Sequence, residues 1–179
     1  MWSYLYSNDK TYSYEKVIRW TRTEDLFLHK RLFIPININN YHWVFLLVLF
    51  ISSANNNPRD MMIEISHYDS FSNSKRKEKS YMNDNIYTQH ITHWLKDESW
   101  TRRNIQLEDS NFRYTIHNRK IPQQKPESNN CGAYVCAYAD YLIDDLDVSL
   151  IQNIDMDKFR LKIGTDIIRG SLLYDGYSA

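Results

Sequence analysis

Apolar segments separated by turn-forming residues define the middle of the chain. Residues 43–51, WVFLLVLFI, form a continuous apolar run, which is typical of a strand that is covered on both faces. Residues 31–38, RLFIPINI, predict a preceding strand, in which Pro35 indicates a sheet edge or a bulge. Residues 61–69, MMIEISHYD, alternate loosely and predict the return strand after a polar turn at 52–60. The pattern therefore predicts a central β-hairpin.

The remaining periodic segments predict helices and one more strand. Helical spacing predicts a short amphipathic helix, a helix that covers the sheet, a helix after a polar loop and a final amphipathic helix, at residues 14–21, 86–99, 131–144 and 155–173. Residues 112–117, FRYTIH, predict a further strand, and residues 70–80 predict a solvated loop with a basic cluster. The mixed order, without repeats or a linker, predicts an α+β class and one domain over residues 1–179.

Composition narrows the possible functions. The chain has 179 residues, with 22 Lys and Arg balanced by 22 Asp and Glu, which argues against a nucleic-acid binder that relies on bulk positive charge. The longest apolar run is strand-sized, so no membrane span is expected, and the N-terminus has no signal-peptide pattern. The two cysteines make no disulfide scaffold, and no Cys/His set has zinc spacing. We expect an intracellular protein without a metal site.

Cys131 is the candidate nucleophile. Asn129 and Asn130 precede it, and asparagine is a favoured helix N-cap, so Cys131 would occupy the first turn, where the helix dipole and free amides favour a thiolate. Gly132 permits the close approach of a substrate backbone. Cys136, in an apolar context, is expected to be a small buried side chain. A buried structural thiol is the alternative for Cys131, and the polar loop before it argues against that alternative.

A nucleophilic thiol needs an imidazole base, and the base needs a carboxylate that orients it. His42 comes just before the strand at 43–51, and Asp69 ends the return strand. If the hairpin folds about Asn55 and Asn56, His42 and Asp69 lie opposite each other at its open end, within a residue or two of slippage. His67 shares a face with Asp69 and stays a reserve candidate.

The other histidines have weaker cases as the base. His90 and His93 lie on a predicted helix as packing or surface groups, and His29 and His117 have no evident partner. Acyl transfer also needs donors for the developing oxyanion. The Cys131 N–H is one donor, and a side-chain amide from Gln123 or Gln124 is another, although an exposed loop role is the simpler interpretation of either glutamine.

Several segments together resemble the ubiquitin-like protein-specific proteases, the SUMO/sentrin protease family of cysteine peptidases. The resemblance rests on FIPININNYHW, HYDSF and IPQQKPESNNCGAYVCAYADYL, supported by YEKVIRWT and FRLKIGTDIIRGSLL. It runs from about residue 3 to about residue 173. His-Trp, Tyr-Asp-Ser, Gln-Gln and Cys-Gly in this order make a strong joint signal.

The resemblance implies an adenain-like α+β fold, with a mixed central sheet flanked by helices and the nucleophile at a helix N-terminus. It assigns His42 as the general base, Asp69 as its orienting carboxylate and Cys131 as the nucleophile. It places Gln124 in the oxyanion hole, and Trp43 over a narrow channel for the substrate's Gly-Gly tail. Neither metal nor cofactor is implied.

Three features depart from the family pattern. The chain begins after the family's first helix, which carries a Trp-Leu-Asn-Asp motif, and Trp2 does not replace that motif. The spacer between the glutamines and the cysteine is one residue longer than in most SUMO proteases, which places Lys125 where the glutamine falls by strict counting. Asn130 replaces the usual aspartate, and we expect it to serve as a cap.

The resemblance implies a monomeric protease that cleaves after the Gly-Gly of SUMO, in conjugates and in precursors. Alternatives are the same chemistry on another ubiquitin-like modifier, on ubiquitin or on a viral polyprotein, a truncated module that binds a modifier without cleaving it and, more remotely, an acetyltransferase built on the same triad. Partners are SUMO or another ubiquitin-like protein and its conjugates, not nucleic acid or a membrane. The family implies the nucleus or cytoplasm, and the basic cluster at 75–79 is read as a surface loop.

Overall fold

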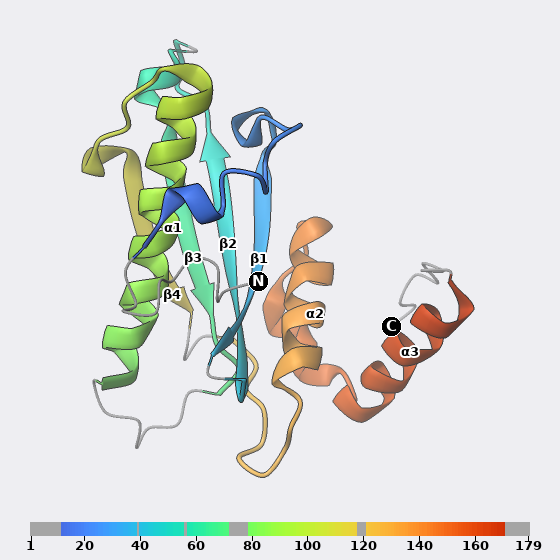
Figure 1. Ribbon diagram of the computed structural model, residues 1–179. Coiled ribbons are helices and arrows are strands. Elements are labelled where there is room, and N and C mark those ends of the chain that lie inside the picture. The colour runs from blue at the N-terminus through green and yellow to red at the C-terminus, as the bar shows by residue number, and fades with distance from the viewer. Residues whose placement is uncertain (1–11, 39, 56, 72–78, 118–120, 171–179) are drawn as a thin grey trace.

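A four-stranded sheet with helices on both faces forms the described part of the protein (Figure 1). The computed structural model describes residues 12–38, 40–55, 57–71, 79–117 and 121–170. The strands are β1 (Arg31–Ile38), β2 (His42–Ile51), β3 (Met62–Tyr68) and β4 (Phe112–His117), and the α-helices are α1 (Lys79–Arg103), α2 (Cys131–Ile143) and α3 (Met156–Arg169). The predicted α+β class is confirmed.

The strands lie in the order β1-β2-β3-β4, with β1, β2 and β3 antiparallel and β4 parallel to β3. Helix α1 makes the crossover that a parallel pair requires. β1 is an edge strand, so Pro35 lies where a missing backbone N–H does the least harm to the ladder. The sheet is therefore mixed, as the family resemblance implied.

The continuous apolar run in β2 is buried because both faces of the sheet are covered. On one face Val44, Leu46 and Val48 pack in a cluster with Ile91 and Leu95 of α1. On the other face Phe45, Leu47 and side chains of α2 form a second cluster. β2 therefore contributes side chains to both halves of the core. Each buried aliphatic side chain contributes about 1.5–3 kcal/mol of transfer free energy.

The β2–β3 register differs from the expected one. Phe45 pairs with Tyr68 rather than with Ser66, which displaces the ladder by two residues. A turn that includes a 3-10 helix at Pro58–Asp60 moves the centre of the hairpin one position along the chain. An even displacement leaves every side chain on its predicted face, which is why the core was predicted correctly despite the shift.

Several helix boundaries also differ from the predictions. The segment at 14–21 forms only a 3-10 helix at Tyr14–Lys16 followed by turns. Helix α1 extends beyond the predicted 86–99 at both ends, so Lys79 and Ser80, the last residues of the predicted loop, belong to the helix. Helix α3 ends at Arg169 because Gly170 adopts a left-handed conformation with φ 64°. Trp2, the rest of the basic cluster at 75–78 and the predicted helix end at 171–173 lie outside the described residues.

Candidate active site

His42 and Asp69 lie at one end of the sheet and are hydrogen-bonded. His42 begins β2 after a tight β1–β2 turn, in which Asn40 takes a left-handed conformation with φ 56°, a conformation that asparagine tolerates better than most residues. The distance from His42 Nε2 to Asp69 Oδ1 is 2.7 Å. In the observed register Asp69 is a diagonal neighbour of His42 rather than its direct partner, and diagonal pairs on one face are within reach of long side chains.

The surroundings of Asp69 favour its ionised form. Asp69 is buried, and burial alone opposes ionisation, but a hydrogen bond from His42 and the charge of that ring outweigh the burial. The Phe71 N–H adds a second bond to the same Oδ1 at 2.8 Å. Together these contacts hold the pKa of the Asp69 carboxyl below its ordinary value. The Phe71 ring also packs edge-on against His42, with 6.0 Å between the ring centroids.

The loop before α2 is attached to the end of β3 by backbone contacts. The Gln124 N–H donates to Ser70 O at 2.8 Å. Gln123 Nε2 donates to Asp69 O and to Ile121 O, both at 3.1 Å. The Gln123 amide is thus engaged with the protein's own carbonyls, whereas Gln124 Oε1 is buried without a hydrogen-bond partner among the described residues. An oxyanion needs an N–H donor, and the Gln123 N–H₂ group is already engaged, which favours Gln124 for that role.

Two tyrosines of α2 fix the other side of this loop. Tyr138 Oη donates to Pro122 O at 2.8 Å, and Tyr134 Oη donates to Gln123 O at 3.2 Å. Neither tyrosine was predicted from the sequence as a functional residue, although their spacing of four places them on one helix face. Figure 1 shows the start of β2, the end of β3, this loop and the start of α2 at the same end of the molecule.

Cys131 is the first residue of α2 and is partly exposed. Asn130 occupies the N-cap position, as predicted, but its side chain makes no capping hydrogen bond, so the expected cap is wrong. Gly132, after Cys131, lies close to Trp43, after His42. A Cβ added to Gly132 would lie 3.7 Å from Trp43 Cδ1. Because Gly132 follows Cys131 and Trp43 follows His42, this contact brings the start of α2 to the start of β2.

An apolar groove lies beside this contact. Its walls come from the sheet and from two helices, at Pro35, Trp43, Gly132, Ala133, Val135, Cys136, Arg160, Ile163 and Gly164. Trp43 is 39% exposed, so the structure leaves its ring open to a ligand. Cys136 is exposed on this groove and is not the buried side chain expected from the sequence, because α2 turns that position away from the sheet. Protein atoms around the sulfur, with Asp140, still raise the pKa of its thiol.

The other histidines have different surroundings from His42. His29 Nε2 lies 3.6 Å from Glu24 Oε2, so the expectation that it has no partner is wrong, but this pair is exposed, unlike the buried pair of His42. His67 is buried, and neither ring nitrogen has a hydrogen-bond partner among the described residues. Burial lowers its pKa to about 4, with Asp69 opposing and with His42 and His117 adding to the effect. His90 is buried and His93 is exposed on α1, as predicted. His117 stacks on Tyr68, with ring centroids 4.6 Å apart.

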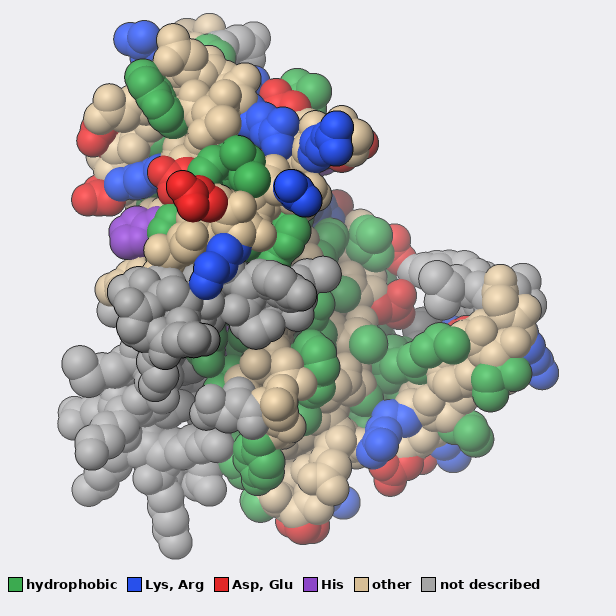
Figure 2. Space-filling model, viewed as in Figure 1, with side chains coloured by type: hydrophobic (Ala, Val, Ile, Leu, Met, Phe, Trp, Pro, Cys, Tyr) green, Lys and Arg blue, Asp and Glu red, His purple; other side chains and the backbone are tan. Residues whose placement is uncertain are grey.

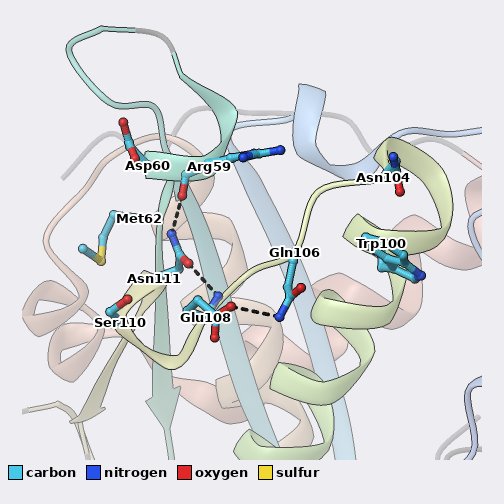
Figure 3. A pocket seen from close by; sticks show the side chains of 9 residues that line it. All are labelled: Arg59, Asp60, Met62, Trp100, Asn104, Gln106, Glu108, Ser110 and Asn111. Carbon is cyan, nitrogen blue, oxygen red and sulfur yellow. Dashed lines mark hydrogen bonds between the residues drawn. The ribbon is translucent and has the colours of Figure 1, made fainter.

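A second cavity, of about 610 Å³, lies at the opposite end of β2 (Figure 3). Its polar walls are largely paired with one another. Asn111 Nδ2 donates to Arg59 O and Met61 O, and its Oδ1 accepts from Glu108 N. Gln106 Nε2 donates to Glu108 Oε1 at 3.0 Å. These contacts join the β2–β3 turn to the segment after α1. The polar residues at this end of β2 therefore have a structural role.

No three His, Cys, Asp or Glu side chains in the described ranges are grouped to bind a metal ion. No described helix is both long and apolar enough to cross a bilayer.

The fold and these contacts define an α+β domain with a histidine–carboxylate pair beside a cysteine at a helix start. Residues 4–171 match the model of the Ulp1 protease family, C-terminal catalytic domain. The chain therefore belongs to the Ulp1 protease family, and the suspected family resemblance is confirmed. It is 28% identical over 172 residues to sentrin-specific protease 2 of Pongo abelii, a match that covers 96% of this chain and 26% of that protein. The human counterpart is 28% identical over 174 residues, again covering 96% and 26%. The chain thus spans about a quarter of the length of these relatives.

Solved structures share the fold. A de-sumoylating protease superposes with a TM-score of 0.58 at 21% identity, over 94% of this chain and 61% of that one. The C-terminal Ulp1 protease domain in complex with Smt3, the yeast orthologue of SUMO, gives a TM-score of 0.57 at 24% identity, over 88% of this chain and 61% of that one. A Ulp1 SUMO protease whose catalytic cysteine is oxidised to a sulfenic acid gives 0.61 at 24% identity, over 88% and 62%.

Proposed function

We propose that this protein is a cysteine isopeptidase that cleaves after the C-terminal Gly-Gly of SUMO, in conjugates and in precursors. The observation that carries the proposal is the His42–Asp69 hydrogen bond at the end of the sheet where α2 begins with Cys131. Membership of the Ulp1 protease family and the likeness to sentrin-specific proteases support SUMO as the substrate. We propose that residues 1–179 act as one catalytic domain, without a metal or cofactor.

The His42–Asp69 hydrogen bond supports a different role for each ring nitrogen of His42. Because Nε2 is bonded to Asp69, Nδ1 is the nitrogen left to exchange a proton with the Cys131 thiol. The thiolate attacks the carbonyl carbon of the terminal glycine, and the Cys131 N–H and the Gln124 amide bind the oxyanion. The C–N bond breaks as His42 returns the proton to the leaving lysine amine. Water, deprotonated by His42, then hydrolyses the thioester and restores the thiol.

Trp43 and Gly132 supply the steric part of the specificity. A Cβ on Gly132 would make van der Waals contact with Trp43 Cδ1, at 3.7 Å. An extended Gly-Gly tail would therefore pass these two residues more easily than residues with side chains. Rejection of larger residues by a narrow passage is a form of specificity that adds no affinity.

We propose an intracellular location, in the nucleus or cytoplasm, and a monomeric protein with SUMO conjugates as partners. Both cysteines are free thiols, which is the usual state in a reducing compartment.

The test is covalent capture by SUMO and by ubiquitin, each carrying a C-terminal electrophile. We expect a SUMO adduct that is absent in Cys131→Ser. An adduct with ubiquitin but not with SUMO would overturn the substrate assignment while keeping the chemistry. Tight SUMO binding without an adduct would overturn the enzymatic assignment and leave a modifier-binding module.

A further inference from the structure

The side chain of Asn130, directly before Cys131, is held from both sides by α3. Asn130 is buried. Its Nδ2 donates to Asp157 Oδ1 at 3.2 Å, and its Oδ1 accepts from Arg160 Nη1 at 2.9 Å. Asp157 and Arg160 are three residues apart, so they project from one face of α3. One amide therefore bridges two helices that are consecutive in the chain.

The first turn of α3 is itself ordered by a cap. The Asp155 carboxylate accepts hydrogen bonds from the Asp157 and Lys158 N–H groups, at 3.1 and 3.2 Å. Met156 and Phe159 are buried in the cluster that contains α2. The two groups that bind Asn130 thus come from a part of α3 that is anchored by both backbone and side-chain contacts.

This arrangement explains why Asn130 does not cap α2. Capping residues adopt an extended backbone and accept from the second or third amide of the helix, whereas Asn130 has φ −96° and ψ 7° and makes no such bond. Because its carboxamide oxygen is occupied by Arg160, it leaves the first amides of α2 to other acceptors. The first amides of α2 include the Cys131 N–H, which is the proposed oxyanion donor.

We propose that Asn130, Asp157 and Arg160 form a clamp that positions Cys131 for reaction. The inference rests on the proposed function. Asn130 O accepts the first bond of α2, from Tyr134 N at 2.9 Å, so a fixed Asn130 side chain and a fixed helix start leave the Cys131 backbone little freedom. These three are positioning residues, since none of them is placed in the reaction itself.

Single removals and their combination test the clamp. We expect Asn130→Ala and Arg160→Met each to lower kcat for a SUMO C-terminal fluorogenic amide by roughly 10- to 100-fold, the effect of a misplacement of about 1 Å. KM should change little. Because both changes break one unit, the double variant should be no slower than the worse single variant. Arg169→Met is the matched control, since it removes a cation from the last turn of α3.

An exchange of donor and acceptor gives a rescue that a general structural role would not. Asn130→Asp alone places a carboxylate against Asp157 and should lower kcat. The pair Asn130→Asp and Asp157→Asn rebuilds the contact with the roles reversed while Arg160 still donates, and kcat should return to within about threefold of the wild type. Equal melting temperatures across the set would show that the fold is kept.

Two results would overturn the clamp. One is a KM increase in Arg160→Met with no effect of Asn130→Ala, since Arg160 also lines the groove beside Trp43 and would then be a substrate contact. The other is strictly additive losses without rescue by the exchanged pair.

A second readout separates the clamp from the SUMO assignment. In a Cys136→Ser background only one thiol reacts, and the alkylation rate of Cys131 by iodoacetamide at neutral pH should fall several-fold in both clamp variants. If the wild type does not cleave SUMO but this pattern holds, the substrate assignment fails and the clamp stands. An unchanged alkylation rate in every variant would remove the clamp.

Discussion

His42 Nε2 lies 2.7 Å from Asp69 Oδ1 at the open end of one hairpin, where His42 begins β2 and Asp69 follows β3. Asp69 follows the last residue of β3, and its Oδ1 also accepts from the Phe71 N–H. The carboxylate is thus held by a backbone N–H as well as by the imidazole. A carboxylate held in this way is suited to orient the His42 ring.

Loss of the Asp69 charge should slow catalysis without unfolding the protein. Asp69→Asn keeps the volume and an oxygen for Phe71 N–H, but it removes the charge that stabilises an imidazolium. We expect kcat for the SUMO fluorogenic amide to fall on the order of 10²–10⁴-fold, and His42→Ala to be at least as slow. Asp109→Asn is the control, because that carboxylate is exposed and pairs with Lys96. Equal rates in Asp69→Asn and wild type would remove Asp69 from the mechanism.

The two glutamines should respond differently to truncation. Gln124→Ala should lower kcat by about 10²–10³-fold if it supplies an oxyanion donor, with no change in melting temperature. Gln123→Ala removes hydrogen bonds to Asp69 O and Ile121 O, so it should lower stability by about 1 kcal/mol per bond and kcat much less. Steady-state kinetics and thermal melting on the same samples measure both effects. The reverse pattern would assign the oxyanion donor to Gln123.

The strands were predictable because their apolar patterns are strong. β1 and β4 match their predicted ranges. β2 begins one residue earlier than predicted, and β3 is one residue shorter at each end. The failures lie where short-range pattern competes with packing. Residues 14–21 carry a helical pattern, yet only Tyr14–Lys16 form a 3-10 helix, because a helix of eight residues is marginal on its own.

The candidate site was predictable in part. His42 and Asp69 were placed together from turn symmetry alone, and an even shift of register kept them within reach. What the sequence did not reveal depends on contacts between distant segments. Asn130 looks like a cap in sequence, and only the approach of Asp157 and Arg160 redirects its side chain. Cys136 looks buried beside apolar neighbours, but the direction of α2 exposes it.

Space at Gly132 should matter for substrate and not for folding. The added Cβ of Gly132→Ala would make ordinary van der Waals contact with Trp43, and the first turn of a helix favours alanine over glycine. We expect an unchanged or slightly raised melting temperature and a KM for SUMO substrates raised several-fold. Ala139→Gly, a change of the same size deeper in α2, controls for helix propensity. Unchanged kinetics in Gly132→Ala would show that the substrate backbone passes elsewhere.

His67 should make stability depend on pH between about 6.5 and 4. Its ring nitrogens have no hydrogen-bond partner among the described residues, and burial lowers its pKa to about 4. The folded protein therefore keeps His67 neutral, whereas the unfolded chain takes up a proton once the pH falls below 6.5. The contribution of neutral His67 to the free energy of unfolding is therefore full above the unfolded-state pKa of 6.5 and is lost as the pH falls towards 4. The loss is roughly 3 kcal/mol at most.

His67→Leu should flatten this part of the profile and preserve catalysis. Leucine suits the site, because His67 lies between Leu46 and Ile116 in the ladder, and replacing an unpaired buried polar group by an apolar one is neutral or stabilising. Asp69 does not produce the slope, since its carboxyl pKa is lowered from 3.8 and its contribution disappears only below that pH. Urea unfolding from pH 7 to pH 4.5 measures the difference, with exposed His93→Gln as the control. If the slope persists in His67→Leu, another group titrates there, and if kcat collapses with an intact fold, His67 rather than His42 is the base.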